Sequence, residues 1–182
     1  KAAENAGNIE LHSNNETRLS DDAVLAANSD IGTGGDIKVL GSDVLLLDNV
    51  RIHANGAEAG GEILIGGDYR GENNLIPHAQ RVLFQETSEI TANAEQVGSG
   101  GKIILWGDDL LGAYGSIEAA GFQQGGFVET SAGVVDLDLS VDVSASGGQA
   151  GKWLIDPYNI EIVDSVPGGA NSVTDNPADP FD

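Results

Sequence analysis

Gly101-Lys102-Ile103-Ile104-Leu105 is one of six related pentapeptides in which a glycine precedes an apolar run that largely alternates with polar residues. The other five are Gly7-Asn8-Ile9-Glu10-Leu11, Gly35-Asp36-Ile37-Lys38-Val39, Gly61-Glu62-Ile63-Leu64-Ile65, Gly126-Phe127-Val128-Glu129-Thr130 and Gly151-Lys152-Trp153-Leu154-Ile155. Their glycines are separated by 28, 26, 40, 25 and 25 residues. A repeat of this length is typical of solenoids, and the alternation is typical of strands with one buried face. The sequence therefore predicts stacked coils of about 25 residues.

A second motif keeps the same phase along the chain. It consists of a β-branched residue, any residue, alanine, any residue and a small residue, and it occurs at 24–28, 52–56, 90–94, 117–121 and 143–147. Its first residue follows the preceding repeat glycine by 17, 17, 29, 16 and 17 residues. The value of 29 and the glycine spacing of 40 together indicate an insertion of about 12 residues, which we place between Gly66 and Gln80.

Stacking these coils at the strand spacing of about 4.8 Å predicts an all-β parallel β-helix (β-solenoid) of about seven coils, a rod roughly 30 Å long. We expect it to occupy residues 1–163, with the insertion near 67–80. Residues 164–182 are acidic and contain proline and glycine, so they are predicted to be a linker or disordered tail.

The repeat also predicts which residues stack above one another. Two inward columns are expected in the pentapeptides, Ile9-Ile37-Ile63-Ile103-Val128-Trp153 and Leu11-Val39-Ile65-Leu105-Thr130-Ile155. A third column, Ala26-Ala54-Ala92-Ala119-Ala145, is expected to form the narrow side of the core. The charged residues between the first two columns, Glu10, Lys38 and Glu129, are predicted to point outward.

Composition excludes several classes of function. Eight Lys and Arg face 29 Asp and Glu, and the formal net charge of −21 would repel nucleic acid and anionic membrane surfaces. No apolar run of about 20 residues is present, so no membrane-spanning helix is expected. The chain has no cysteine, which excludes disulfides and thiolate metal sites.

Several longer motifs carry a resemblance to a known family. In order, they are 66–71 (Gly-Gly-Asp-Tyr-Arg-Gly), 104–109, 114–121, 125–131 and 151–160, the last containing Trp153-Leu154-Ile155-Asp156-Pro157-Tyr158-Asn159. From about Gly35 to Val163 the chain resembles the filamentous-haemagglutinin-like large exoproteins of two-partner secretion. Haemophilus-type high-molecular-weight adhesins and haem-haemopexin utilisation proteins contain similar stretches. The resemblance implies a right-handed parallel β-helix that is exported through an outer-membrane partner transporter.

The resemblance does not specify which part of such a protein the chain represents. The Asn-rich signatures of the family's amino-terminal secretion domain are not visible, so the sequence looks like a stalk. The expected function is non-enzymatic and adhesive display on the bacterial outer surface or outside the cell. Its partners would be a host or neighbouring cell, or further copies joined end to end in a filament. The alternative is a secretion pro-piece or a segment that binds a haem carrier.

Candidate chemistry is sparse. His12 and His53 each follow an inward residue and should be solvated, and no histidines have the spacing of a zinc site. Asp108, Asp109, Asp136 and Asp138 would be the candidates for glycan cleavage, but Asp108-Asp109 fits a corner turn better. No cofactor is expected, and no calcium-binding repeat is present, although so many carboxylates would attract loosely bound Ca²⁺.

The insertion is the best candidate for partner contact. It combines aromatic, cationic and imidazole side chains on an interrupted repeat, and loops on rigid scaffolds are where binding usually occurs. We predict contact through Asp68, Tyr69, Arg70 and His78. If the alternative haem-related function holds, Tyr69 or His78 would be the residues involved.

Overall fold

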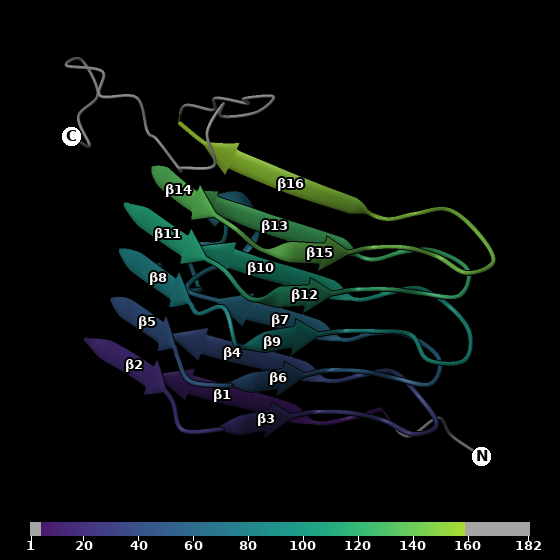
Figure 1. Cartoon of the computed structure of the whole chain (residues 1–182). Coiled ribbons are helices and arrows are strands. Elements are labelled where there is room, and N and C mark those ends of the chain that lie inside the picture. The colour runs from purple at the N-terminus through teal and green to yellow at the C-terminus, as the bar shows by residue number, and fades with distance from the viewer. Residues whose placement is uncertain (1–4, 159–182) are drawn as a thin grey trace.

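Sixteen short strands wind into a single stack of coils in the computed structural model, which describes residues 5–158 (Figure 1). Every strand pair is parallel, and each coil contributes one strand to each of three sheets. The predicted parallel β-helix is therefore confirmed. Within the described residues, the only helical element is the 3₁₀ turn η1 (Tyr69–Gly71), and no helix is long and apolar enough to cross a bilayer.

The three sheets contain six, five and five strands. The first sheet has the order β1 (Asn8–His12), β4 (Asp36–Leu40), β7 (Glu62–Ile65), β10 (Lys102–Trp106), β13 (Phe127–Ala132) and β16 (Lys152–Pro157). The second has β2 (Glu16–Leu19), β5 (Asp43–Leu46), β8 (Arg81–Phe84), β11 (Leu110–Ala113) and β14 (Val134–Leu137). The third has β3 (Val24–Ala26), β6 (Arg51–His53), β9 (Glu89–Thr91), β12 (Ser116–Glu118) and β15 (Ser140–Asp142).

The number of coils is smaller than the seven predicted. Five coils are complete, and β16 begins a sixth. Six strands at the usual spacing make a rod about 24 Å long rather than roughly 30 Å. Residues 159–163, which the repeat assigns to a further coil, and the predicted tail at 164–182 both lie outside the described residues.

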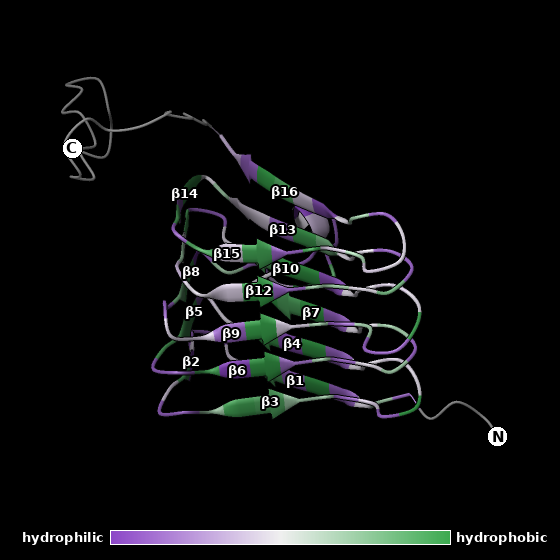
Figure 2. Cartoon of the chain, turned by 45° about the vertical axis from the view of Figure 1, so that its right-hand side comes forward, coloured by the Kyte–Doolittle hydropathy of each residue, from purple (hydrophilic) through white to green (hydrophobic). Residues whose placement is uncertain are grey.

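Register in the first sheet follows the prediction at every position. Ile9, Ile37, Ile63, Ile103, Val128 and Trp153 are partners in consecutive strands, as are the members of the second predicted column. Apolar side chains of the three sheets form one core cluster. Most strands in Figure 2 carry green, hydrophobic segments beside polar ones. Branched aliphatic residues dominate this core because they pack well on a pleated surface.

The third predicted column is wrong at both ends. The alanine carbonyls that accept a hydrogen bond from the next repeat glycine belong to Ala27, Ala54, Ala92 and Ala119, and Val143 takes this role in the last coil. Ala26 is exposed and Ala145 lies two residues beyond the column. The cause is that the number of residues between the repeat glycine and the third sheet differs from coil to coil. Leu25 and Val141, not Val24 and Val143, are the partners of the inward isoleucines.

Candidate functional site

The insertion forms a loop on the outer side of the first sheet, and residues 66–80 are called the outer loop from here on. Its two ends meet, because the Ala79 N–H donates to the Gly66 carbonyl at 2.6 Å. The Gly66 N–H is itself bound to the Val39 carbonyl, and the Gln80 N–H to that of Ser42. The coil thus continues from β7 to β8 as if the loop were absent. The residues of the predicted insertion thus lie outside the coil path, between β7 and β8.

The outer loop covers the middle of a row of side chains that point away from the core. This row is Glu10, Lys38, Leu64, Ile104, Glu129 and Leu154, taken in register across the first sheet. Glu10 is exposed, whereas Leu64, Ile104 and Glu129 are at most 1% exposed. They do not belong to the main core cluster. Glu129 therefore points outward as predicted, yet it is fully buried because the loop covers it.

Aromatic contacts fasten the loop to neighbouring strands. The Tyr69 ring packs edge-on against Phe127 with centroids 5.7 Å apart, and the His78 ring lies tilted on Trp106 at 5.6 Å. Gly71 sits where a Cβ atom would come within 3 Å of both Trp106 and His78, and its φ of +61° favours glycine independently. The loop is a packed layer on the sheet.

Asp68 carries the charged part of this attachment. Its carboxylate accepts hydrogen bonds from the Tyr69 N–H at 2.6 Å, Asn73 Nδ2 at 2.8 Å and Lys102 Nζ at 3.0 Å. Burial raises the pKa of Asp68, but these donors outweigh burial, so its pKa lies below the ordinary value. Lys102 also pairs with Glu62 at 2.7 Å. Burial lowers the pKa of Lys102, yet its two carboxylate partners raise it overall.

His78 joins a second polar contact at the far end of the loop. Its Nδ1 lies 3.2 Å from Asp108 Oδ1, which also accepts a hydrogen bond from Trp106 Nε1 at 2.9 Å. Asp108 and Asp109 lie in the turn between β10 and β11, as the sequence predicted. Asp136 lies on β14 and accepts a hydrogen bond from the Tyr114 hydroxyl. Each of these carboxylates except Asp109 has a structural partner here.

The four predicted contact residues all lie in the outer loop, but they differ in accessibility. Asp68, Tyr69 and His78 are half-buried against the sheet, and only Arg70 is exposed, with its guanidinium 5.2 Å from the Tyr69 ring centroid. Leu75, which the sequence reasoning missed, is 90% exposed. Partner contact through these residues stays a prediction. The surface that could make it consists of Arg70, Leu75 and the exposed residues between them.

A shallow groove of about 670 Å³ adjoins the loop and runs along the stack. Its floor is formed by the paired glycines at the coil corners, which have no side chains to fill it. One bank consists of the first residues of the first-sheet strands, among them Asp36, Glu62, Lys102, Phe127 and Lys152. Lys102 and Phe127 also touch the outer loop. The groove therefore borders the loop at its half-buried residues Asp68 and Tyr69.

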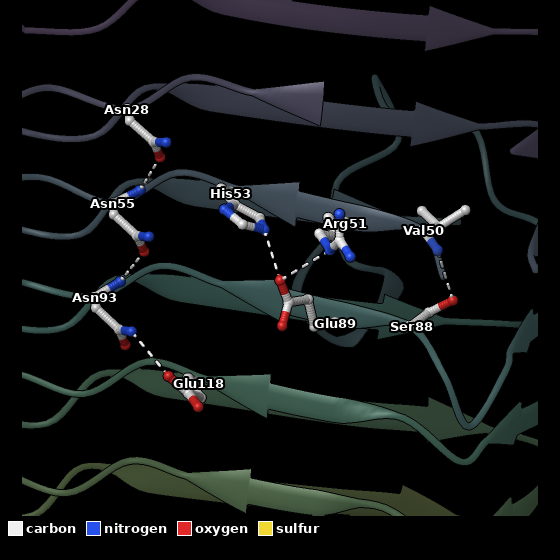
Figure 3. Close-up of polar contacts among 9 residues, drawn as sticks. All are labelled: Asn28, Val50, Arg51, His53, Asn55, Ser88, Glu89, Asn93 and Glu118. Carbon is white, nitrogen blue, oxygen red and sulfur yellow. Dashed lines mark hydrogen bonds and ion pairs between the residues drawn. The ribbon is translucent and has the colours of Figure 1, made fainter. Parts of the chain in front are cut away.

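The polar face of the third sheet has a different character (Figure 3). Asn28 Oδ1 accepts a hydrogen bond from the Asn55 N–H, and Asn55 Oδ1 accepts one from the Asn93 N–H, so side-chain amides link successive coils. Glu89 lies 3.1 Å from His53 and 3.6 Å from Arg51. These groups bind one another across neighbouring coils and so help to hold the stack together. Across the described residues, no three His, Asp or Glu side chains converge as a metal site would require.

A comparison with solved structures finds a similar fold in the crystal structure of the HMW1 secretion domain from Haemophilus influenzae. The match has a TM-score of 0.63 and 30% sequence identity, and it covers 83% of this chain and 43% of that one. The chain thus spans less than half the length of that domain. No protein-family model and no curated protein matches the chain.

This likeness supports the relationship to two-partner secretion proteins that the sequence motifs indicated. It does not distinguish the particular kind of adhesin. It also bears on the stalk interpretation, because the similar structure is a secretion domain, the part of such proteins whose signatures were not visible in the sequence.

Proposed function

We propose that the chain is a β-helix segment of the secretion domain of a bacterial two-partner secretion exoprotein. In this role it would be exported through an outer-membrane partner transporter, reach the cell surface or the medium, and catalyse no reaction. The observation that carries the proposal is the likeness to the HMW1 secretion domain over 83% of the chain. The partner bonds of Asp108 and Asp136 support a non-enzymatic role, because they leave these carboxylates engaged in packing.

A competition experiment tests the export role. The 182-residue sequence would be produced in the periplasm of bacteria that secrete the parent exoprotein through its own transporter. Because both chains would occupy the same transporter, we expect the secreted parent protein to fall severalfold on immunoblots of the medium. The variant Gly101→Ala, in which the coil stack is disturbed, is the matched control and should compete poorly. Unchanged secretion, with the folded chain present in the periplasm, would contradict the proposal.

Adhesive display is the second candidate function, and the exposed part of the outer loop favours it. Arg70 is exposed and Leu75 projects almost fully into solvent, on a loop that packs against the first sheet. Arginine and large apolar side chains are common anchors at protein interfaces. A haem-carrier protein is the alternative partner for the same surface.

Substitution of Tyr69 and Arg70 by alanine tests this surface. If it anchors a partner, binding of the purified chain to host cells, or to a haem-loaded carrier in a parallel measurement, should fall about tenfold or more. Arg70→Ala alone separates contact from loop packing, since Tyr69 then still packs on Phe127. Arg18→Ala, an exposed arginine on β2, is the control and should bind normally. Equal binding by all these variants would rule out the loop as the contact.

A further inference from the structure

The carboxyl group of Glu129 is fully buried beneath the outer loop and is only partly satisfied. Its Oε1 accepts hydrogen bonds from the Arg70 N–H at 3.1 Å and from the Ser131 hydroxyl at 2.8 Å. Its Oε2 is buried and has no hydrogen-bond partner among the described residues. A buried charge that lacks full hydrogen bonding is costly, so the ionised form is poorly accommodated here.

The charged groups around Glu129 do not offset this cost. On β13 its polar neighbour is the uncharged Ser131, and its register partners on β10 and β16 are Ile104 and Leu154. Asp156 on β16 disfavours the ionised form, whereas Arg70 in the loop favours it. Asp68 of the outer loop is bound by Lys102 of β10, which also pairs with Glu62 of β7. No cation of the described residues forms an ion pair with Glu129 within 4 Å.

The loop residue that touches Glu129 is itself held in a strained conformation. Arg70 has φ of 54° and ψ of 17°, in the left-handed region that non-glycine residues rarely adopt. Such conformations persist where neighbouring contacts over-determine them. The hydrogen bond from the Arg70 N–H to Glu129 is one such contact, and losing it would favour relaxation of this part of the loop.

We propose that Glu129 is a proton-controlled latch for the outer loop, which stays closed while the carboxyl group is neutral and loosens when it ionises. The neutral group keeps Oε1 as an acceptor for Arg70 and Ser131 without placing a charge under the loop. Ionisation leaves a charge among apolar side chains, which is relieved when the loop lifts and water enters. The latch concerns the surface invoked for partner contact, but it does not depend on which partner binds there.

The direction of the pH dependence follows from Glu129 on β13 and Asp68 in the outer loop. Burial raises the pKa of Glu129 above its ordinary value, so loop closure takes up a proton and weakens as the pH rises through that raised pKa. The pKa of Asp68 is lowered instead, so its contribution is lost only as the pH falls below its ordinary value. Closure should therefore be strongest in mildly acidic solution. Between the ordinary pKa of a glutamate and the raised pKa of Glu129, opening should increase by up to about tenfold per pH unit, and it should level off above the raised pKa.

Hydrogen exchange measured by mass spectrometry between pH 5 and pH 8 tests the latch, after correction for the intrinsic pH dependence of exchange. In the full 182-residue chain, we expect protection of peptides from 66–80 to decrease severalfold as the pH rises, while β4 and β5 remain protected. Glu129→Gln, which cannot ionise, should remove this dependence. Glu10→Gln, in the exposed part of the same row, should retain it.

A flat protection profile in the wild-type chain, or the same slope in Glu129→Gln, would overturn the proposal. A direct measurement covers the case in which the variant folds poorly. The side-chain carboxyl carbon of Glu129, followed by NMR in the wild-type chain, should titrate at a pH clearly above the ordinary pKa of a glutamate side chain. Titration of Glu129 at that ordinary pKa would equally exclude the latch. None of these outcomes depends on whether the chain takes part in secretion.

Discussion

Gly101→Ala should destabilise the protein by about 3 kcal/mol or more, whereas Gly7→Ala should change stability by less than about 0.5 kcal/mol. The two glycines are equivalent in the repeat, each lying directly before a strand of the first sheet. A Cβ atom at Gly101 would lie 2.1 Å from the Gly61 carbonyl oxygen and 2.8 Å from the Ala92 Cβ. At Gly7 the same atom would meet nothing within 4 Å. The difference in stability between the two variants therefore measures how closely one coil must approach the next.

Thermal unfolding followed by circular dichroism measures this pair. For a domain of this size, 3 kcal/mol corresponds to a fall in Tm of roughly 6–12 °C. The clash at Gly101 involves a backbone oxygen, which cannot move without breaking inter-coil hydrogen bonds, so a side-chain adjustment cannot remove it. Equal Tm values for the two variants would show that the coil spacing is set by something other than the glycine corner.

Glycine spacing predicted the first sheet well because the corner glycine fixes the phase of the strand that follows it. Ile103 lies two residues after Gly101, and the same offset holds in every coil, so the inward column could be read directly from the sequence. The third sheet lies farther from this marker. Coil length varies before it, and a one-residue change moved the inward position from Val24 to Leu25. A period-two pattern amplifies such a slip, because neighbouring residues face opposite sides.

The candidate site was predictable in position but not in its interior. A break in the repeat located the outer loop, yet nothing local to Glu129 indicates that a loop about 60 residues earlier covers it. One signal was present in the sequence. Ile63-Leu64-Ile65 and Ile103-Ile104-Leu105 are continuous apolar runs, unlike the alternating Ile9-Glu10-Leu11, and they mark strands buried on both faces. The first run directly precedes the insertion, and the second is the corresponding run of the next coil. Their position indicates that the insertion covers the outer face of these two strands.

Phe84→Ala is expected to cost about 3–5 kcal/mol, which is the usual range for removing a fully buried aromatic ring. Phe84 is fully buried on β8 in the middle coil, between Leu46 of the coil before and Ala113 of the coil after. Its ring also reaches Gly115, where an added Cβ would come within 2.5 Å of it. The small residues above the ring cannot expand to fill the space that it leaves. A cavity therefore opens between two coils.

The position of this cavity determines how the loss should appear. In a solenoid each coil contacts only its neighbours, so stability depends on each interface between coils. Weakening the middle interface should lower the unfolding midpoint and also uncouple the two halves.

Urea unfolding followed by tryptophan fluorescence reports the second half through Trp106 and Trp153, and hydrogen exchange in β4 reports the first. Leu75→Ala, at a residue 90% exposed, is the control and should leave both unchanged. A loss below about 1 kcal/mol in Phe84→Ala would mean that adjacent coils close the cavity, and that the aliphatic columns, not the aromatic ring, hold the middle of the stack together.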